Sequence, residues 1–265
     1  MSNSGAENRH TGGGSKMTSD ALVVDVSRDW AIACDVQQRF MQPLVPAMEA
    51  LDYSARCRQM RELGGDCYDF APLADNCLAV TIGDASGKSL AAALMIANVQ
   101  SSLRTAALFT GNDLAAMLKA VNRQVHASSL TDRYATLFYG VFKGATRTLR
   151  YVNAGHNPPI VIRRNGSVHW LESGGAPVGM FPDSHYEEGA VELYPGDRVL
   201  AYTDGVIEAV NPADVDWGVE GLRRAATEND ARSAQDIVQA IFTSMDEFSR
   251  GHQADDATVV VLKVL

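Results

Sequence analysis

The sequence predicts an α+β fold in which mainly antiparallel strands are layered against helices. Beyond residue 50 it contains seven short runs rich in β-branched and aromatic residues, and turn signals rather than helices separate several of them. Helical apolar periodicity occurs in two groups, near 89–128 and near 233–249. Because strands that follow one another directly favour antiparallel pairing, a layered sandwich is expected. The predicted strands are 77–82, 134–142, 148–153, 159–162, 168–171, 198–202 and 257–264.

The N-terminal 46 residues are predicted to precede the main domain. Residues 1–22 are rich in Ser, Gly, Asn and Thr and lack apolar periodicity, so we expect a disordered tail. Within 23–46, Ile32, Val36 and Phe40 recur every four residues and form one helical stripe. This linker or regulatory helix would pack on the core, contact a second copy, or act as a regulatory lever; the pattern does not choose among the three.

Residues 47–265 are predicted to form one domain, because no internal repeat or long linker divides them. Asn165-Gly166, between two strand runs, is a hairpin signal. The helix at 89–108 is apolar on nearly all sides and is expected to be buried on several faces. The helices at 112–128 and 233–249 each carry a single apolar stripe.

The overall composition excludes several classes of protein. With 23 Lys+Arg against 32 Asp+Glu, the formal net charge of -9 argues against general affinity for nucleic acid or an anionic membrane. No apolar run has the roughly 18–20 residues that span a bilayer, so a cytoplasmic protein is expected. The four cysteines form no CxxC pair, which indicates neither a zinc site nor a disulfide framework.

Four short segments place an aspartate at the end of a strand-like run or in a glycine-rich turn. Each one alone is weak evidence, because Asp-Gly is common in turns and Asp84 could cap a helix. Together, short carboxylates leaving strand ends suit a hard divalent cation such as Mg²⁺ or Mn²⁺, and four of them suit two ions that share ligands. The segments are GGDCYD at 64–69, GDASGKS at 83–89, TDG at 203–205 and ADDAT at 254–258.

Seven motifs follow one another between residues 64 and 264, within a resemblance that covers roughly residues 33–265: GGDCYDF, IGDASGKSLAAALMIANVQSSLRT, YATLFYGVF, LRYVNAGHNPPIVIR, PVGM, LYPGDRVLAYTDGVIEA and DDATVVVLKV. This ordered set resembles the bacterial metal-dependent protein phosphatases of the PPM superfamily (PP2C-like), of the stage II sporulation protein E and general-stress type. The resemblance implies a PPM-type α-β-β-α sandwich with two central, mainly antiparallel sheets flanked by helices. It also implies an edge site with two Mn²⁺ or Mg²⁺ ions and hydrolysis of phosphoserine or phosphothreonine in a protein.

The resemblance further implies roles for individual residues. Asp84 would bridge the two ions, Ala85 would offer its backbone carbonyl, and Asp256 would support its neighbours. Asp69 would either assist the site or only hold its loop. A water activated by the two metals would attack the phosphorus directly, without a phosphoenzyme. The residues implied as carboxylate metal ligands and catalytic groups are Asp66, Asp84, Asp204 and Asp255.

Other polar residues of these motifs are given no catalytic role. His156, in AGHNPP, is expected to be structural, and Ser86 and Ser89 lack a paired base, so nucleophilic serine catalysis is not expected. Two positions depart from the family pattern without removing an implied ligand. Ser89-Leu90 stands where Gly and a small or β-branched residue are usual, and Cys67 replaces an aromatic residue.

The resemblance also suggests a substrate and partners. The substrate would be a phosphorylated anti-sigma-factor antagonist of the STAS type, and control would come from an upstream regulatory protein or from a homodimer contact through the N-terminal helix. The alternative is a catalytically silent or conditionally active protein of the same fold that binds a phosphoprotein. A two-metal nuclease is disfavoured, because the sequence shows no basic groove signature.

Overall fold

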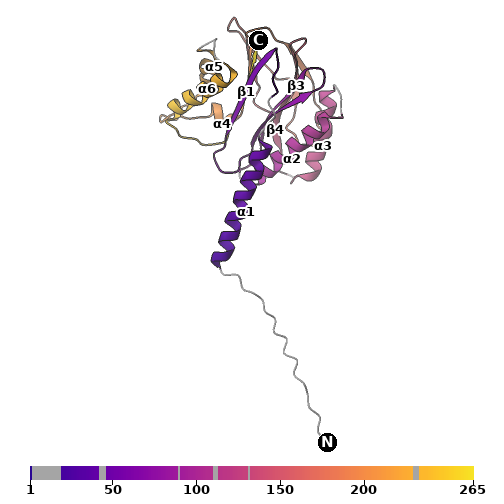
Figure 1. The fold of residues 1–265 in the computed structure, drawn as a ribbon, viewed down its shortest axis with the longest axis vertical. Coiled ribbons are helices and arrows are strands. Elements are labelled where there is room, and N and C mark those ends of the chain that lie inside the picture. Colours follow the sequence, from indigo (N-terminus) through magenta and orange to yellow (C-terminus); the bar gives the residue numbers. More distant parts are fainter. Residues whose placement is uncertain (2–18, 42–45, 89, 110–112, 131, 229–232) are drawn as a thin grey trace.

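Two central sheets lie between two layers of helices in the computed structural model (Figure 1). The structure describes residue 1 and residues 19–41, 46–88, 90–109, 113–130, 132–228 and 233–265. The predicted α+β sandwich of mainly antiparallel sheets is therefore confirmed.

The first sheet contains five strands, and every neighbouring pair is antiparallel. Its last two strands form the predicted hairpin around Asn165-Gly166, where the Gly166 N–H donates to the Arg163 carbonyl at 2.9 Å. In spatial order the strands are β1 (Leu51–Arg58), β11 (Ala257–Val264), β10 (Arg198–Tyr202), β6 (Ile160–Ile162) and β7 (Val168–Trp170).

Among the described residues, the second sheet contains six strands, and β5 and β8 are its one parallel pair of strands. The strand β9 (Gly189–Glu192) pairs with β5 beside the main path. The other strands, in spatial order, are β2 (Asp66–Leu73), β3 (Cys77–Ala85), β4 (Ala135–Lys143), β5 (Thr148–Ala154) and β8 (Gly174–Gly175).

Three apolar clusters hold these layers together. One lies between the two sheets, one between the second sheet and helices α2 (Leu90–Ala107) and α3 (Leu114–Ser128), and one between the first sheet and helices α5 (Gly218–Thr227) and α6 (Ala234–Ser249). The short helix α4 (Asp204–Ile207) directly follows β10. Burial of apolar side chains on both faces of each sheet is the main stabilising term of such a sandwich.

Helix α1 (Ser19–Phe40) extends away from the sandwich (Figure 1). Residues 19–22, predicted as the end of a disordered tail, instead form its first turn, and residues 2–18 lie outside the described part of the chain. The predicted stripe is exposed, by 51% at Ile32, 48% at Val36 and 37% at Phe40. The stripe therefore does not pack on the core, and the two alternatives of a second copy or a regulatory lever stay open.

Several elements differ from the sequence predictions. The strands β1, β2, β8 and β9 and the helices α4 and α5 were not predicted. β1 ends in Arg56 and Arg58, whose guanidinium groups lie 4.8 and 5.2 Å from the centre of the Phe242 ring on α6, so these charged residues cover an apolar helix. The helix α2 packs on the sheet, on α3 and on α1, as expected for a helix buried on several faces, but Leu90 and Leu94 are exposed, so it is not buried all round.

Candidate active site

Four segments of the two sheets meet at one edge of the sandwich. On the second sheet, Asp66 begins β2 and pairs in register with Asp84 near the end of β3. On the first sheet, Asp204 follows β10 and Asp255 precedes β11, and these two strands are antiparallel neighbours. The structure therefore brings the four carboxylates implied as metal ligands to the same edge, two from each sheet.

Asp66 is the most deeply buried of these carboxylates, with 1% of its surface exposed. Its Oδ2 accepts hydrogen bonds from Thr203 Oγ1 at 2.7 Å and from Thr258 Oγ1 at 2.6 Å. Thr203 follows β10 and Thr258 lies in β11 of the first sheet, so their bonds to Asp66 connect the two sheets. These two donors were not predicted from the sequence, although each belongs to an acidic motif, TDG or DDAT.

The carboxylates are close enough to perturb one another's ionisation. Burial, and then the charges of Asp204, Asp255 and Asp256, raise the pKa of Asp84 to about 7. Burial and the charge of Asp84 also raise the pKa of Asp66. The pKa of Asp204 is raised by burial, to which the charge of Asp255 adds. Concentrated negative charge of this kind favours a bound cation.

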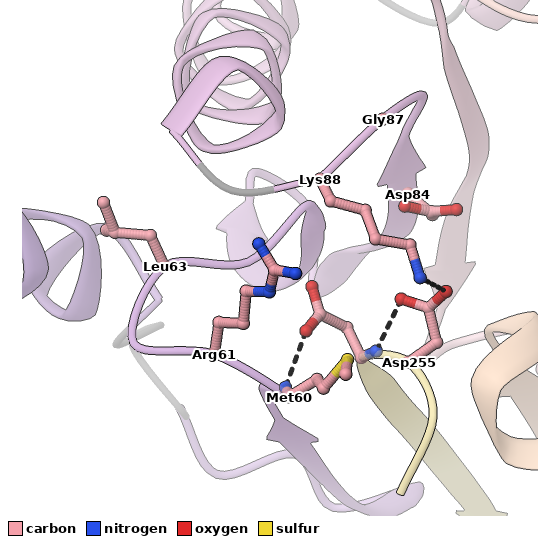
Figure 2. A pocket seen from close by; sticks show the side chains of 8 residues that line it. Met60, Arg61, Leu63, Asp84, Gly87, Lys88 and Asp255 are labelled. Atoms are coloured by element: carbon pink, nitrogen blue, oxygen red, sulfur yellow. Dashed lines mark hydrogen bonds and ion pairs between the residues drawn. The ribbon is translucent and has the colours of Figure 1, made fainter.

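A lysine from the second acidic motif supplies positive charge at this edge. Lys88 Nζ lies 2.8 Å from Asp255 Oδ2, and its charge partly offsets the rise in the pKa of Asp84 (Figure 2). Arg61 also lines this small pocket (Figure 2). Within the described ranges, no three His, Cys, Asp or Glu side chains lie close enough together to hold a metal ion.

The donors present nevertheless suit a hard divalent cation. Carboxylate oxygens and a backbone carbonyl are the ligand types that Mg²⁺ and Mn²⁺ prefer. Burial first, and then repulsion from neighbouring carboxylates, raises the pKa values of Asp66, Asp84 and Asp204, and a bound cation would offset both costs of keeping these groups ionised. The residues at this edge therefore fit the metal that the sequence predicts.

Two further aspartates hold neighbouring parts of the chain in place, and Asp256 also lines the pocket beside Asp84 and Asp255. Asp256 Oδ1 accepts from the Met60 N–H at 2.7 Å, and Oδ2 accepts from the Gly65 N–H at 2.8 Å, so Asp256 fixes the loop before Asp66. Asp69 is buried and forms a two-bond ion pair with Arg104 of α2, at 2.6 and 2.8 Å. This pairing turns Asp69 toward α2 and favours the alternative in which it only holds its surroundings.

The glycine of the TDG motif is needed for close packing at the site. A Cβ atom on Gly205 would lie 2.0 Å from the carbonyl oxygen of Asp256, a backbone atom that cannot give way. Ala85 also meets the first motif, because its N–H donates to the Gly65 carbonyl at 3.0 Å. Ser86 Oγ accepts from the Tyr134 N–H at 3.0 Å, and no base is paired with it in the part of the chain that the structure covers. Ser89 lies outside the described residues.

No helix among the described residues is both long and apolar enough to cross a bilayer. This holds for α1 as well, although that helix has 22 residues.

Comparison with known proteins gives a consistent match. The family "Stage II sporulation protein E (SpoIIE)" matches residues 74–265. Protein IcfG of Synechocystis sp. is 29% identical over 259 residues, which cover 86% of this chain and 40% of IcfG. Phosphoserine phosphatase RsbU of Bacillus subtilis is 27% identical over 240 residues, which cover 90% of this chain and 71% of RsbU. This chain thus spans less than half the length of IcfG.

Solved structures share the fold. The catalytic domain of the serine/threonine protein phosphatase PstP, in complex with two manganese ions, superposes with a TM-score of 0.61 at 19% identity. The superposition covers 82% of this chain and 99% of the PstP domain.

Proposed function

Because the chain belongs to the stage II sporulation protein E family, whose catalytic domain is PP2C-like, we propose that it is a metal-dependent serine/threonine protein phosphatase. The observation that carries this proposal is the meeting of four carboxylates, two from each sheet, at one edge of the sandwich. Burial, together with the charges of neighbouring carboxylates, raises the pKa values of Asp66, Asp84 and Asp204, which supports a cation-binding role for this edge.

The proposed metal ligands are Asp66, Asp84, Asp204 and Asp255, with the backbone carbonyl of Ala85. Two bound Mn²⁺ or Mg²⁺ ions would supply an activated water and neutralise charge on the phosphoryl oxygens. The other proposed roles belong to the chain itself. Thr203 and Thr258 orient the Asp66 carboxylate by donating to the same oxygen, which also leaves its other oxygen for a different partner.

Two cations at the rim suit a phosphorylated substrate. The Lys88 ammonium and the Arg61 guanidinium both face the pocket that the acidic residues line (Figure 2). A phosphoserine dianion approaching an acidic edge would be repelled by it, and these side chains reduce that repulsion. We assign them to substrate attraction rather than to the chemical step.

The proposed substrate is a phosphoserine or phosphothreonine on a regulatory protein, an anti-sigma-factor antagonist of the STAS type. The relative RsbU is named a phosphoserine phosphatase, which supports phosphoserine as the residue that is dephosphorylated. The STAS-type identity rests on the family resemblance.

We further propose that α1 transmits control from an upstream protein or a second copy of the chain. Its exposed stripe of Ile32, Val36 and Phe40 offers a surface for such a partner. Its opposite side is tied to the catalytic domain, since Trp30 Nε1 donates to Glu62 and Gln37 Nε2 donates to the Gly64 carbonyl at 2.7 Å. A partner bound to α1 would therefore act directly on the loop before Asp66.

A conditionally active protein is the second candidate function. Lys88 holds Asp255, and in the described part of the molecule no three candidate ligands lie within reach of one ion. The carboxylates at this edge would then have to move closer together before a metal binds, and a partner bound to α1 could cause that movement.

The test is phosphate release from a phosphoserine peptide with and without Mn²⁺. The wild type is compared with Asp84→Asn and Asp204→Asn, which keep side-chain size, and with Asp183→Asn, whose carboxylate is exposed and pairs loosely with Arg123 at 3.7 Å. We expect metal-dependent release that falls at least about 100-fold in the first two variants and is unchanged in the third.

Metal-independent release, or release that survives both substitutions, would contradict the proposal. Mn²⁺ binding without release would favour the conditionally active alternative, and release would then be sought with a partner that binds α1.

A further inference from the structure

His156 lies buried at the same edge of the sandwich, and the proposed chemistry gives it no role. It belongs to the AGHNPP motif and only 5% of its surface is exposed. A buried histidine beside a carboxylate cluster is either ordinary packing or a support for the ligands. Its surroundings decide between these two.

The chain fixes the backbone of His156 with two devices. The side-chain amide of Asn153 accepts the His156 N–H at 2.8 Å and donates to the His156 carbonyl at 3.0 Å. Gly155 has a φ of +68°, and a Cβ there would lie 2.6 Å from the Pro177 ring, so only glycine fits between them. The NAGH turn is thus built to hold one residue in one place.

The His156 ring contacts the sheet that carries Asp66 and Asp84. Its Nδ1 lies 2.9 Å from Thr136 Oγ1. Thr136 is the register partner of Asp84 across β3 and β4, so the two side chains share one face of the sheet. The same hydroxyl lies 3.5 Å from the Asp84 carbonyl oxygen, at the long limit of a hydrogen bond.

The other side of the ring faces the sheet that carries Asp204 and Asp255. Strand β6 pairs antiparallel with β10, so the chain entering β6 from His156 runs beside the chain leaving β10 toward Asp204. Tyr202 Oη donates to the Pro158 carbonyl at 3.2 Å, which confirms that the two segments stay together. The Tyr202 backbone interacts with the His156 ring and favours its protonated form, although the buried Nε2 makes no hydrogen bond of normal geometry to any described residue. The ring therefore stands between the two halves of the carboxylate set.

We propose that His156 is a positioning residue that, through Thr136, sets the spacing between the Asp84 side and the Asp204 side of the metal site. This inference rests on the proposed function. Ligands that come from two sheets need their separation fixed. The bonds of Asp66 to Thr203 and Thr258, of Gly65 to Asp256 and of Lys88 to Asp255 fix other parts of this edge. The contact of His156 with Thr136 adds a connection at the register partner of Asp84. Removing a residue that supports a metal ligand typically weakens metal binding by about 10–100-fold.

The experiment measures Mn²⁺ affinity by calorimetry on the full chain, with the melting temperature of each metal-free variant recorded beside it. Thr136→Val replaces the hydroxyl by a methyl group of the same shape, and Thr136→Ser keeps the hydroxyl. His156→Asn removes the ring. The matched control is His126→Asn on α3, because His126 Nδ1 also contacts a single oxygen, the Gly179 carbonyl at 2.8 Å, in another layer of the fold.

We expect Thr136→Val and His156→Asn to weaken Mn²⁺ binding at least about 10-fold, Thr136→Ser to stay within about threefold of wild type, and His126→Asn to leave affinity unchanged even where it lowers the melting temperature. Affinities of Thr136→Val within about twofold of wild type would overturn the inference while the proposed function stands. If His156→Asn does not fold, the Thr136 pair decides alone. A wild type that binds no Mn²⁺ would overturn the proposed function, and this inference with it.

Discussion

At the scale of single residues, Lys88 and a divalent cation would compete for the same carboxylate. Lys88 Nζ lies 2.8 Å from Asp255 Oδ2, and both side chains are about half exposed, so the pair is weak. Lys88→Met removes the charge and keeps most of the stem. We expect Mn²⁺ to bind about threefold more tightly, because both the competing ammonium and its repulsion of the cation are lost.

Calorimetry on this variant, with Lys119→Met of α3 as an exposed control, measures the effect. Weaker Mn²⁺ binding in Lys88→Met would show instead that the lysine supports the cluster.

The sequence predicts the aspartates of the site better than their supports. Asp84 stands near the end of β3 beside Asp66 of the adjacent β2, and Asp204 follows β10 beside the start of the adjacent β11, so strand pairing alone brings the members of each pair together. The partners of Asp69 and Asp66 lie far away along the chain, Arg104 by 35 residues and Thr258 by 192. Only the fold brings these donors into contact, and no local pattern records them.

At the scale of elements, segments with strong apolar periodicity were predictable from the sequence, and segments with a weak or interrupted pattern were not. The single apolar stripe predicted for α3 is buried in the structure. The helix α6, for which a single apolar stripe was also predicted, begins with a capping box between Ser233 and Asp236. β2 carries two aspartates and Pro72, which hide its strand pattern, and α5 contains glycines that lower its helix propensity. Both depend on neighbours for their stability.

Helix α1 is joined to the first acidic motif by one buried amide. Gln37 Nε2 donates to the Gly64 carbonyl at 2.7 Å, and Gln37 Oε1 accepts from the Gly64 N–H at 3.2 Å. Gln37→Leu would leave both backbone groups unpaired, which costs about 1–3 kcal/mol for each buried group. We expect hydrogen exchange of the Gly64 amide to speed up at least about fivefold.

The neighbouring Gln38 is exposed, so Gln38→Leu is the control for added apolar surface on the same helix. Equal exchange rates at Gly64 in wild type and Gln37→Leu would contradict this coupling.

At the scale of the whole molecule, His156 between the two sheets makes the sandwich sensitive to acid. Burial lowers its pKa to about 4, whereas the unfolded chain binds a proton near pH 6.5. The unfolded state therefore gains protons first as the pH falls. The contribution of neutral His156 to the free energy of unfolding is complete above about pH 6.5 and is lost progressively toward pH 4. The loss amounts to about 2 kcal/mol between pH 7.5 and pH 5.

Urea unfolding at both pH values measures this loss. Asp66 and Asp84 act in the opposite direction, because their raised pKa values make the folded state take up protons as the pH falls. The contribution of His156 is therefore measured by comparing how much the free energy of unfolding changes between the two pH values in wild type and in His156→Asn. A variant that loses as much stability as wild type over this range would rule out His156 as the source.

The proposed metal site is tested most directly by locating the bound metal ion in the structure. Crystals of the full chain soaked with Mn²⁺ would be examined by anomalous diffraction, which locates the ion without reference to activity. We expect anomalous peaks enclosed by Asp66 and Asp84 from one sheet and by Asp204 and Asp255 from the other. Peaks elsewhere on the molecule, or none at this edge under saturating Mn²⁺, would contradict it.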